Sequence, residues 1–292
     1  MEISPLASLV RRTSVSCLTE FLKMRNLCCS VLVVFVLSSV LVESATEDRF
    51  HLKDQNQVLG DRSPIFKGGR IVGGGVATAG QFPYQVGLLS GNFLFCGGSL
   101  IDSRWVLTAA HCVTKGVQVT AASAITVLAG TISNSVGIRL SVARVLRHER
   151  YGNFRNDVAL LQLSQTVPSS NTVRPIALRL TPVPEGSEVI ISGWGRIYQG
   201  GPTSSVLKYN RATAMGDQWC RSRTGIPSGL ICLTSPEKNG ACNGDSGGPA
   251  VFNNELVGVC NFIIQYCGSS NPDGYAKVSE FVPWIQATMR RY

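Results

Sequence analysis

Residues 244–249 of this 292-residue chain read Gly-Asp-Ser-Gly-Gly-Pro. This stretch supplies together a candidate nucleophile, an anion-binding site and a carboxylate. A serine hydroxyl is a weak nucleophile unless a neighbouring base takes its proton. The chain has three histidines, and His111 lies in Leu-Thr-Ala-Ala-His-Cys at 107–112, between an apolar run and a cysteine. That context indicates a fixed position, so His111 is the candidate base for Ser246.

Asp157 precedes the apolar run Val-Ala-Leu-Leu at 158–161, which predicts that this acid is buried with the segment that follows it. A buried carboxylate needs hydrogen-bond donors, because burying an unpaired charge is costly. His111 can be such a donor. The sequence therefore predicts that Asp157, His111 and Ser246 come together in the folded chain.

The order of these motifs resembles the chymotrypsin family of serine endopeptidases, and the resemblance covers 71–292. It implies an all-β fold of two packed antiparallel β-barrels, with the active site between them and a short C-terminal helix. It also implies roles: Ser246 attacks the scissile carbonyl, His111 is general base and then general acid, and Asp157 holds the imidazole tautomer. The N–H groups of Gly244 and Ser246 would form the oxyanion hole.

Each motif alone has a simpler interpretation, because Gly-Asp-Ser-Gly is often a turn and Ala-His-Cys is often packing. Their occurrence together in the family's order favours the protease. Two alternatives stay open: a protease homologue that has lost catalysis, and a secreted immune-cascade or binding protein that uses this fold for recognition. The chain lacks no residue of the triad, which favours the enzyme.

The 222 residues from 71 onward are enough for a buried core in a single all-β unit. Charged residues make up 15% of the chain, and short apolar runs separated by turn residues occur at 85–89, 189–191 and 256–259. These runs predict strands.

A C-terminal helix is expected from about Ser279, which would be its N-cap. Phe281, Ile285 and Met289 recur there at helical spacing.

Residues 1–45 are interpreted as an N-terminal extension and a signal peptide. Residues 27–42 carry no charge, follow basic residues and are too short to span a bilayer comfortably, and the small residues near Ala45 suit cleavage. The charged extension before Met24 is unusual, so Met24 is the expected working start. This predicts a secreted, extracellular protein without stable membrane association; an uncleaved signal anchor is the alternative.

Residues 46–70 are polar, charged and without periodicity, which predicts an activation propeptide ahead of the protease domain at 71–292. They end in Gly-Gly-Arg, and an arginine in such a segment is accessible to a trypsin-like protease. The family resemblance implies that cleavage after Arg70 frees the Ile71 ammonium to pair with Asp245. This pairing would bring the Gly244 N–H into the oxyanion hole.

The net charge of the chain is +9, and residues 71–292 carry +7, from 18 Lys and Arg against 11 Asp and Glu. The basic residues are scattered, and only Arg144, Arg147 and Arg150 form a cluster. A solvated basic face is therefore favoured over a nucleic-acid site, and attraction to acidic substrates or surfaces is left open.

Ten cysteines are present, and three of them, Cys17, Cys28 and Cys29, belong to the leader. The other seven suit an oxidising compartment, although spacing alone does not assign bridges. The family resemblance implies the pairs Cys96–Cys112, Cys220–Cys232 and Cys242–Cys267. Cys260 is left over in an apolar run, where a buried inert thiol is favoured over a reactive one.

No cofactor and no metal are predicted. Neither a Cys-x-x-Cys pair nor a His-x-x-x-His spacing occurs from residue 71 onward, and residues 131–139, where some family members bind calcium, contain no carboxylate.

Specificity in this family depends on the pocket that receives the side chain before the scissile bond. Trypsins have an Asp at its base six residues before the nucleophile, and that position is Gly240, which disfavours trypsin-like cleavage. Ala241 and the segment Asn261-Phe262-Ile263 are the expected walls. The branched Ile263 is expected to narrow the entrance, as a bulky residue does in elastases.

Asp273 aligns with the far wall of this pocket. A glycine at the base with an acid at this position resembles arthropod digestive chymotrypsins and collagenolytic serine proteases. Asp273 could bind a basic side chain, or stay hydrated while an apolar side chain fills the pocket. We expect chymotrypsin-like or mixed chymotrypsin/elastase-like specificity.

The sequence as a whole predicts a secreted serine endopeptidase that is made as a zymogen and has a digestive role. The expected partners are protein or peptide substrates, an activating trypsin-like protease and protein protease inhibitors.

Overall fold

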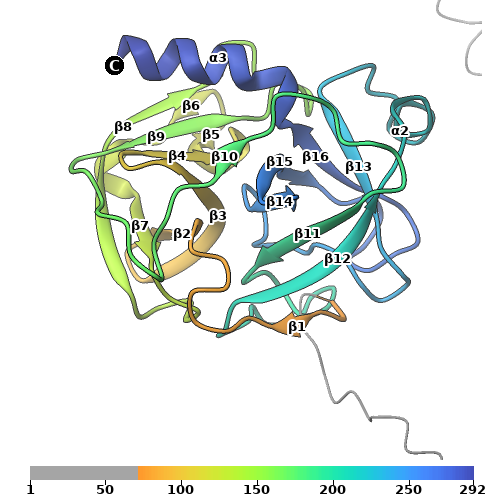
Figure 1. The fold of residues 1–292 in the computed structure, drawn as a ribbon, viewed down its shortest axis with the longest axis horizontal. Helices are drawn as coiled ribbons and strands as arrows, with labels where there is room; N and C mark the ends of the chain where they lie inside the picture. Colours follow the sequence, from red (N-terminus) through yellow and green to blue (C-terminus); the bar gives the residue numbers. More distant parts are fainter. Residues whose placement is uncertain (1–71) are drawn as a thin grey trace, which may run out of the picture. The chain divides into compact units, whose positions relative to one another are not determined.

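The computed structural model describes residues 72–292; the expected leader and propeptide, Arg70 and Ile71 lie outside the described residues. Antiparallel strands form two closed barrels, drawn in Figure 1 in orange to light green and in dark green to blue. The all-β class and the two-barrel architecture predicted from the sequence are confirmed.

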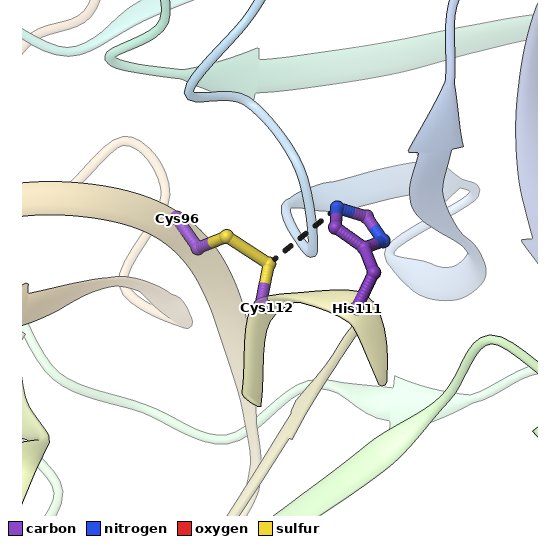
Figure 2. A group of neighbouring side chains, drawn as sticks. All are labelled: Cys96, His111 and Cys112. Carbon is purple, nitrogen blue, oxygen red and sulfur yellow. Dashed lines mark hydrogen bonds between the residues drawn. A yellow bond between two sulfur atoms is a disulfide. The ribbon is translucent and has the colours of Figure 1, made fainter. Parts of the chain in front are cut away.

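The first barrel closes through six strands in the order β2-β3-β4-β9-β8-β7. Their bounds are β2 (Gln85–Ser90), β3 (Phe93–Asp102), β4 (Trp105–Thr108), β7 (Thr126–Ala129), β8 (Ile138–Arg147) and β9 (Ala159–Leu163). Between β4 and β7 lie the 3-10 turns η1 (His111–Val113) and η2 (Ala122–Ala124) and the hairpin of β5 (Thr114–Lys115) and β6 (Gln118–Val119). The disulfide Cys96–Cys112 joins β3 to η1 and so holds this turn against the barrel (Figure 2).

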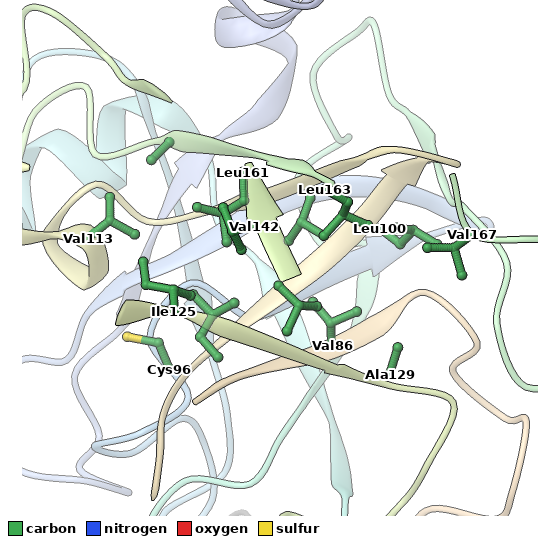
Figure 3. Close-up of a cluster of buried hydrophobic side chains, with 14 of the residues drawn as sticks. Val86, Cys96, Leu100, Val113, Ile125, Ala129, Val142, Leu161, Leu163 and Val167 are labelled. Atoms are coloured by element: carbon green, nitrogen blue, oxygen red, sulfur yellow. The ribbon is translucent and has the colours of Figure 1, made fainter. Parts of the chain in front are cut away.

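Aliphatic side chains fill the interior of the first barrel (Figure 3). Leu88, Leu100 and Leu161 come from three different strands and are fully buried in one cluster. Burying each such side chain contributes roughly 1.5–3 kcal/mol. The barrel is therefore a firm support for the loops at its rim.

The second barrel also has six strands: β11 (Glu188–Gly193), β12 (Lys208–Ala214), β13 (Leu230–Thr234), β14 (Pro249–Phe252), β15 (Glu255–Phe262) and β16 (Asp273–Lys277). They follow the order β12-β11-β14-β15-β16-β13, and the pairing of β13 with β12 closes the ring. Two short strands extend it: β1 (Gly75–Val76) pairs with β12, and β10 (Ala177–Leu178) runs parallel to β15. The three predicted apolar strands lie in β2, β11 and β15.

The C-terminal helix α3 (Val278–Arg291) buries Phe281 and Ile285 in a cluster with residues of both barrels, and it lies across the top of the first barrel in Figure 1. The predicted helix is confirmed, but its predicted cap is wrong. Lys277 is the N-cap, without a side-chain hydrogen bond, because the chain enters the helix directly from β16. None of the helices in the described part is long and apolar enough to cross a membrane.

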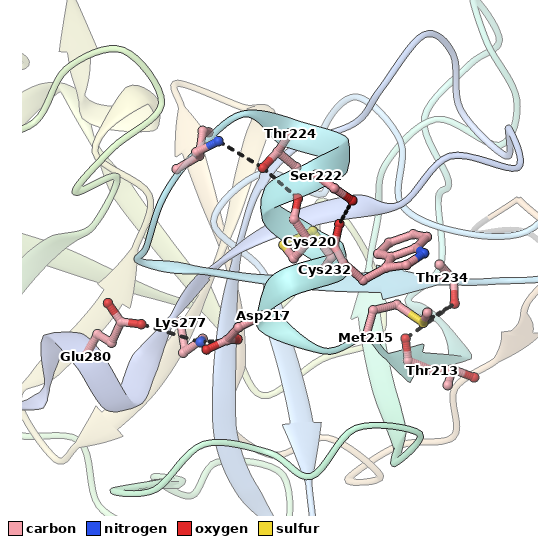
Figure 4. The surroundings of a disulfide bond; sticks show 12 residues. Thr213, Met215, Asp217, Cys220, Ser222, Thr224, Cys232, Thr234, Lys277 and Glu280 are labelled. Atoms are coloured by element: carbon pink, nitrogen blue, oxygen red, sulfur yellow. Dashed lines mark hydrogen bonds and ion pairs between the residues drawn. A yellow bond between two sulfur atoms is a disulfide. The ribbon is translucent and has the colours of Figure 1, made fainter.

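The helix α2 (Asp217–Thr224) was not predicted. Only Cys220 is buried in it, so its sequence has no apolar face to detect. The disulfide Cys220–Cys232 and the 2.5 Å ion pair between Lys277 Nζ and Asp217 Oδ1 hold it against the second barrel (Figure 4). Tertiary contacts therefore decide this helix.

Candidate active site

A buried acid and a half-exposed imidazole form the part of the site that lies on the first barrel. Asp157 precedes β9 and is 1% exposed, whereas His111 begins η1 and is 32% exposed. Asp157 Oδ1 accepts the backbone N–H of His111 at 2.8 Å, and Asp157 Oδ2 lies 2.7 Å from His111 Nδ1. The carboxylate therefore favours the tautomer with the proton on Nδ1, which leaves Nε2 as the basic nitrogen.

The turn that carries Ser246 is anchored to the first barrel through its backbone. Ser246 O accepts the Gly97 N–H at 2.8 Å. Gly247 has a φ of +77°, and a Cβ there would lie 2.2 Å from Thr108 Oγ1, so only glycine permits this approach. Because Thr108 ends β4 three residues before His111, the serine and the imidazole lie at the same edge of the first barrel.

No hydrogen bond joins Ser246 Oγ to the imidazole within the described residues. His111 Nε2 lies instead 3.8 Å from the disulfide sulfur of Cys112 (Figure 2). Such contacts are often long in an enzyme without substrate and shorten in the complex. The structure thus fixes the His111–Asp157 pair and places the backbone of Ser246 at the same edge of the first barrel.

The backbone N–H groups of the turn 244–248 fall into two sets. Those of its second, fourth and fifth residues donate to backbone carbonyl oxygens. Those of Gly244 and Ser246 have no protein acceptor within residues 72–292, and both residues are partly exposed. Two free donors beside a serine hydroxyl are the arrangement that stabilises an oxyanion.

The carboxylate of Asp245 is buried beneath this turn, with 3% exposure. Its Oδ1 accepts the Gly195 N–H at 2.7 Å, and its Oδ2 accepts the Cys242 N–H at 2.9 Å. Burial raises the pKa of Asp245 to about 6, although these two hydrogen bonds oppose the rise. Within the described part of the chain its hydrogen bonds come from backbone amides alone.

Gly240 and Asp273, both predicted for the specificity pocket, come together from distant parts of the sequence. Gly240 has a φ of +127°, and a Cβ there would lie 2.7 Å from Asp273 Oδ2. The same oxygen accepts the Ala241 N–H at 2.8 Å. Asp273 is 8% exposed, and its burial raises its pKa to about 7. The structure therefore brings Gly240, Ala241 and Asp273 together.

Asn261 and Phe262 of the predicted pocket wall contact Phe154 in the loop before Asp157. The Asn261 amide Nδ2 donates to the backbone oxygen of Phe154 at 3.0 Å, so this side chain holds the loop before Asp157. Phe154 packs edge-on against Phe262, with ring centroids 5.6 Å apart. Phe154 was missed because its loop carries no motif. Ile263 packs against the clusters that contain Ala241 and the disulfide Cys242–Cys267.

His148 and Cys260 are buried groups that contribute to packing and take no part in the proposed chemistry. His148 is 3% exposed and stacks on Trp284, and its burial lowers its pKa. Its Nδ1 accepts the Arg150 N–H at 3.1 Å. Cys260 has a free buried thiol whose pKa burial raises well above the usual range, which makes it unreactive as a nucleophile.

Cys96, His111 and Cys112 place three potential ligand atoms within 4.8 Å of one another. The two sulfurs form the disulfide Cys96–Cys112, so neither is a thiolate, and this cluster does not fit a metal ion. The other two disulfides, Cys220–Cys232 and Cys242–Cys267, are likewise those that the resemblance implies.

Comparisons with known proteins agree with this geometry. The model of the Trypsin family matches residues 71–285. Serine protease SP24D of Anopheles gambiae is 68% identical over 248 residues, which cover 84% of this chain and 92% of that protein. Trypsin II-P29 of Gallus gallus is 37% identical over 233 residues, covering 76% of this chain and 90% of the relative.

Among solved structures, neuropsin, a serine protease expressed in the limbic system of mouse brain, matches with a TM-score of 0.67 and 28% identity. The match covers 74% of this chain and 98% of neuropsin. The fold, the family match and these relatives agree, and the chain belongs to the trypsin family of serine proteases, which are endopeptidases.

Proposed function

We propose that this chain is a secreted serine endopeptidase that is made as a zymogen, is activated by cleavage after Arg70 and has chymotrypsin-like or mixed chymotrypsin/elastase-like specificity in a digestive role. One observation carries the catalytic part of the proposal. The Asp157–His111 pair and the Ser246 turn with its two free N–H donors meet at one edge of the first barrel. The uncharged segment at 27–42 supports secretion.

In the proposed reaction, Ser246 Oγ attacks the carbonyl carbon of the scissile peptide while its proton passes to His111 Nε2. The carbonyl oxygen becomes an oxyanion that accepts the N–H groups of Gly244 and Ser246. His111 then protonates the leaving amine, the C–N bond breaks, and an acyl-enzyme forms on Ser246. Water, deprotonated by His111, releases the acid and restores the serine. Asp157 holds the imidazolium in place.

Activation follows from the state of Asp245. Its burial with amide donors only is unfavourable for the ionised form, so a new cation nearby stabilises it. Cleavage after Arg70 creates such a cation at Ile71. Support comes from Val72, the next residue, which is buried and pairs with Gly240, five residues before Asp245. Pairing then fixes the Gly244 N–H in the oxyanion hole.

Specificity is proposed to rest on the glycine at the pocket base, the acid in its wall and the branched side chain at its entrance. Gly240 carries no side chain, Ile263 packs against the cluster that contains Ala241, and Asp273 adds an acidic group. This combination favours medium apolar or aromatic side chains before the scissile bond. The mixture of trypsins and chymotrypsins among its relatives is compatible with such a pocket.

The experiment combines cleavage with labelling. Purified chain, Arg70→Gln and Ser246→Ala are treated with trypsin and then with an organophosphonate that labels active serine proteases. Only the unchanged chain is expected to take the label, and only after trypsin treatment. Labelling of trypsin-treated Arg70→Gln would disprove activation at this bond. Absence of label in the cleaved unchanged chain would favour the alternative, a binding or immune-cascade protein with this fold.

A further inference from the structure

Residues 148–158 join β8 to β9 and include Asp157, the acid of the proposed triad, and we call them the acid loop. The His148 N–H donates to Val158 O at 3.1 Å, so the two ends of the loop lie side by side. Three non-glycine residues of the loop have φ angles between +49° and +60°: Asn153, Phe154 and Asn156. This left-handed conformation costs free energy, so other contacts must hold the loop in its shape.

Arg150 is held at both of its backbone polar groups. Its N–H donates to His148 Nδ1 at 3.1 Å, and its carbonyl oxygen accepts the side-chain amide of Asn156 at 2.8 Å. Asn156 directly precedes Asp157, and its own carbonyl oxygen accepts the Val158 N–H at 2.9 Å. A continuous path of hydrogen bonds therefore leads from the imidazole of His148 to the residue before the triad acid.

The first turn of the acid loop also brings Tyr151 towards Asp157. The Tyr151 N–H donates to His148 O at 3.1 Å. Burial raises the pKa of Tyr151, and the negative charge of Asp157 adds to the rise, so the phenol lies within the field of this carboxylate. The Arg147 guanidinium lies over the same ring, 5.8 Å from its centroid. The position of this turn and the surroundings of the triad acid are therefore linked.

Helix α3 fixes the ring of His148. The ring is 3% exposed, stacks on Trp284 with centroids 4.9 Å apart, and meets Phe281 edge-on at 5.9 Å. Glu149 Oε2 lies 3.9 Å from His148 Nδ1 but accepts the Trp284 Nε1–H at 2.9 Å. Because the Arg150 N–H points at Nδ1, this nitrogen must carry a lone pair, and the imidazole must be neutral.

A proton on Nδ1 would remove this acceptor, because both ring nitrogens of an imidazolium are donors. Burial is the largest influence and lowers the pKa of His148; the charge of Glu149 opposes this change and that of Arg150 adds to it. Helix α3 faces the ring with Phe281 and Trp284, neither of which titrates. The fold therefore favours the neutral ring, and acid works against the closed loop.

We propose that His148 is a positioning residue for Asp157: its neutral imidazole holds the acid loop closed, and a proton on Nδ1 releases it. The inference rests on the proposed function, since the position of Asp157 matters for catalysis only if the triad operates. His148 touches no reacting atom and acts through Arg150 and Asn156. Acid thus lowers activity at a second place besides the imidazole of His111.

Two variants separate this role from packing. His148→Asn keeps an acceptor, because its Oδ1 takes the place of Nδ1, but it loses the ring that stacks on Trp284. His148→Phe keeps a ring and loses the acceptor. On chain cleaved after Arg70, kcat for one peptide at pH 8 should be nearly unchanged in His148→Asn and up to about ten-fold lower in His148→Phe. The reverse order, or equal values in all three proteins, would overturn the proposal.

The pH profile tests the release of the loop. The kcat/KM values of the unchanged enzyme and of His148→Asn are measured from pH 4.5 to pH 8, and the effect of His111 cancels in their ratio. The ratio of His148→Asn to the unchanged enzyme should be constant above about pH 6.5, the ordinary histidine pKa. Below it the ratio should rise by up to about ten-fold per pH unit. A ratio that stays constant down to pH 4.5 would refute the release.

The Arg150 amide reports the hydrogen bond to His148 without catalysis. Uncleaved Ser246→Ala chain labelled with ¹⁵N is titrated by NMR over the same pH range. The Arg150 amide proton should move upfield as the His148 ring signals titrate, and it should stay in place in His148→Asn. An Arg150 amide that does not follow His148 would refute the proposal even in an active protease. An amide that follows His148 in a chain without activity would support the contact and count against the proposed function instead.

Discussion

Asp157 on the first barrel and Asp245 on the second are both almost fully buried, yet their partners differ. Asp157 receives both its hydrogen bonds from His111, through the backbone N–H and the imidazole. Asp245 receives its two from the backbone of Gly195 and Cys242. An imidazole can carry positive charge and an amide cannot. The first barrel therefore provides Asp157 with a partner that can carry charge, whereas the described residues give Asp245 amide donors only, and we propose that cleavage after Arg70 supplies its cation.

The difference assigns separate tasks to the two halves of the site. The first barrel holds the proposed base, His111, against Asp157. The second carries the proposed nucleophile and oxyanion donors on a turn whose buried acid, Asp245, lacks a charged partner in the described residues. In the proposed mechanism, activity is therefore withheld in the second barrel.

The largest loss of kcat should come from removing Ser246 or His111, the proposed nucleophile and base from the two barrels. Ser246→Ala and His111→Ala are each expected to lower kcat by about a million-fold, and the double variant should be little worse, because the two side chains act as one unit. Steady-state kinetics on one peptide substrate measures this. Additive losses would show that the two residues act independently.

Replacing Asp157 and replacing Asp245 should lower kcat by different amounts, because the two acids act by different mechanisms. Asp157→Asn is expected to fold and to lose about ten-thousand-fold in kcat, because the imidazole loses its favoured tautomer. Asp245→Asn should lose about 100- to 1,000-fold, the cost of an oxyanion donor that is no longer held. Circular dichroism checks folding, and Glu188→Gln, an exposed acid of the second barrel, is the control with unchanged kinetics. Equal losses in the two variants would remove the distinction between the barrels.

Unfolding free energy should reveal the buried acids of the second barrel that have amide donors but no charged partner in the described residues. The folded pKa of Asp273, about 7, lies above its ordinary value of 3.8, so its contribution to stability is full at low pH and is lost as pH rises from about 4 to about 7. Asp273→Asn should therefore gain about 4 kcal/mol of unfolding free energy at pH 8 relative to pH 4, compared with the unchanged residue.

Urea unfolding of the uncleaved Ser246→Ala chain at the two pH values measures this difference and avoids autolysis. Asp157→Asn in the same background is the comparison, and it should lose stability at pH 8, because it weakens the contact with His111. A variant at Asp273 that is no more stabilised at pH 8 than at pH 4 would contradict the assignment of a strained ionised acid.

The smallest predicted effect concerns the pocket entrance. Ile263→Gly should raise the preference for Phe over Leu by roughly ten-fold, because a methylene-sized change in an apolar pocket is worth about 1–3 kcal/mol. The ratio of kcat/KM for matched Phe and Leu peptides reports it, and cleavage after small residues is the internal control. An unchanged ratio would mean that Ile263 serves the packing around Cys242–Cys267 and not the entrance.

Short-range chemistry determined much of this protein in advance. Apolar runs of strand length predicted β2, β11 and β15, and the spacing of Phe281 and Ile285 predicted the C-terminal helix, because alternation and helical periodicity are local properties of the chain. The motifs around His111, Asp157 and Ser246 likewise predicted three candidate catalytic residues, and the structure brings His111 and Asp157 into contact. Their chemical roles stay predictions.

Tertiary structure alone decided the rest, because those features depend on contacts between residues far apart in sequence. The helix α2 exists through a disulfide and an ion pair to β16, and the Asn261 amide turns to Phe154, 107 positions away. The difference between the hydrogen-bond donors of Asp157 and those of Asp245 also depends on contacts between residues far apart in sequence. Sequence determines that an acid is present, but the fold determines its burial and its donors, and these set its charge.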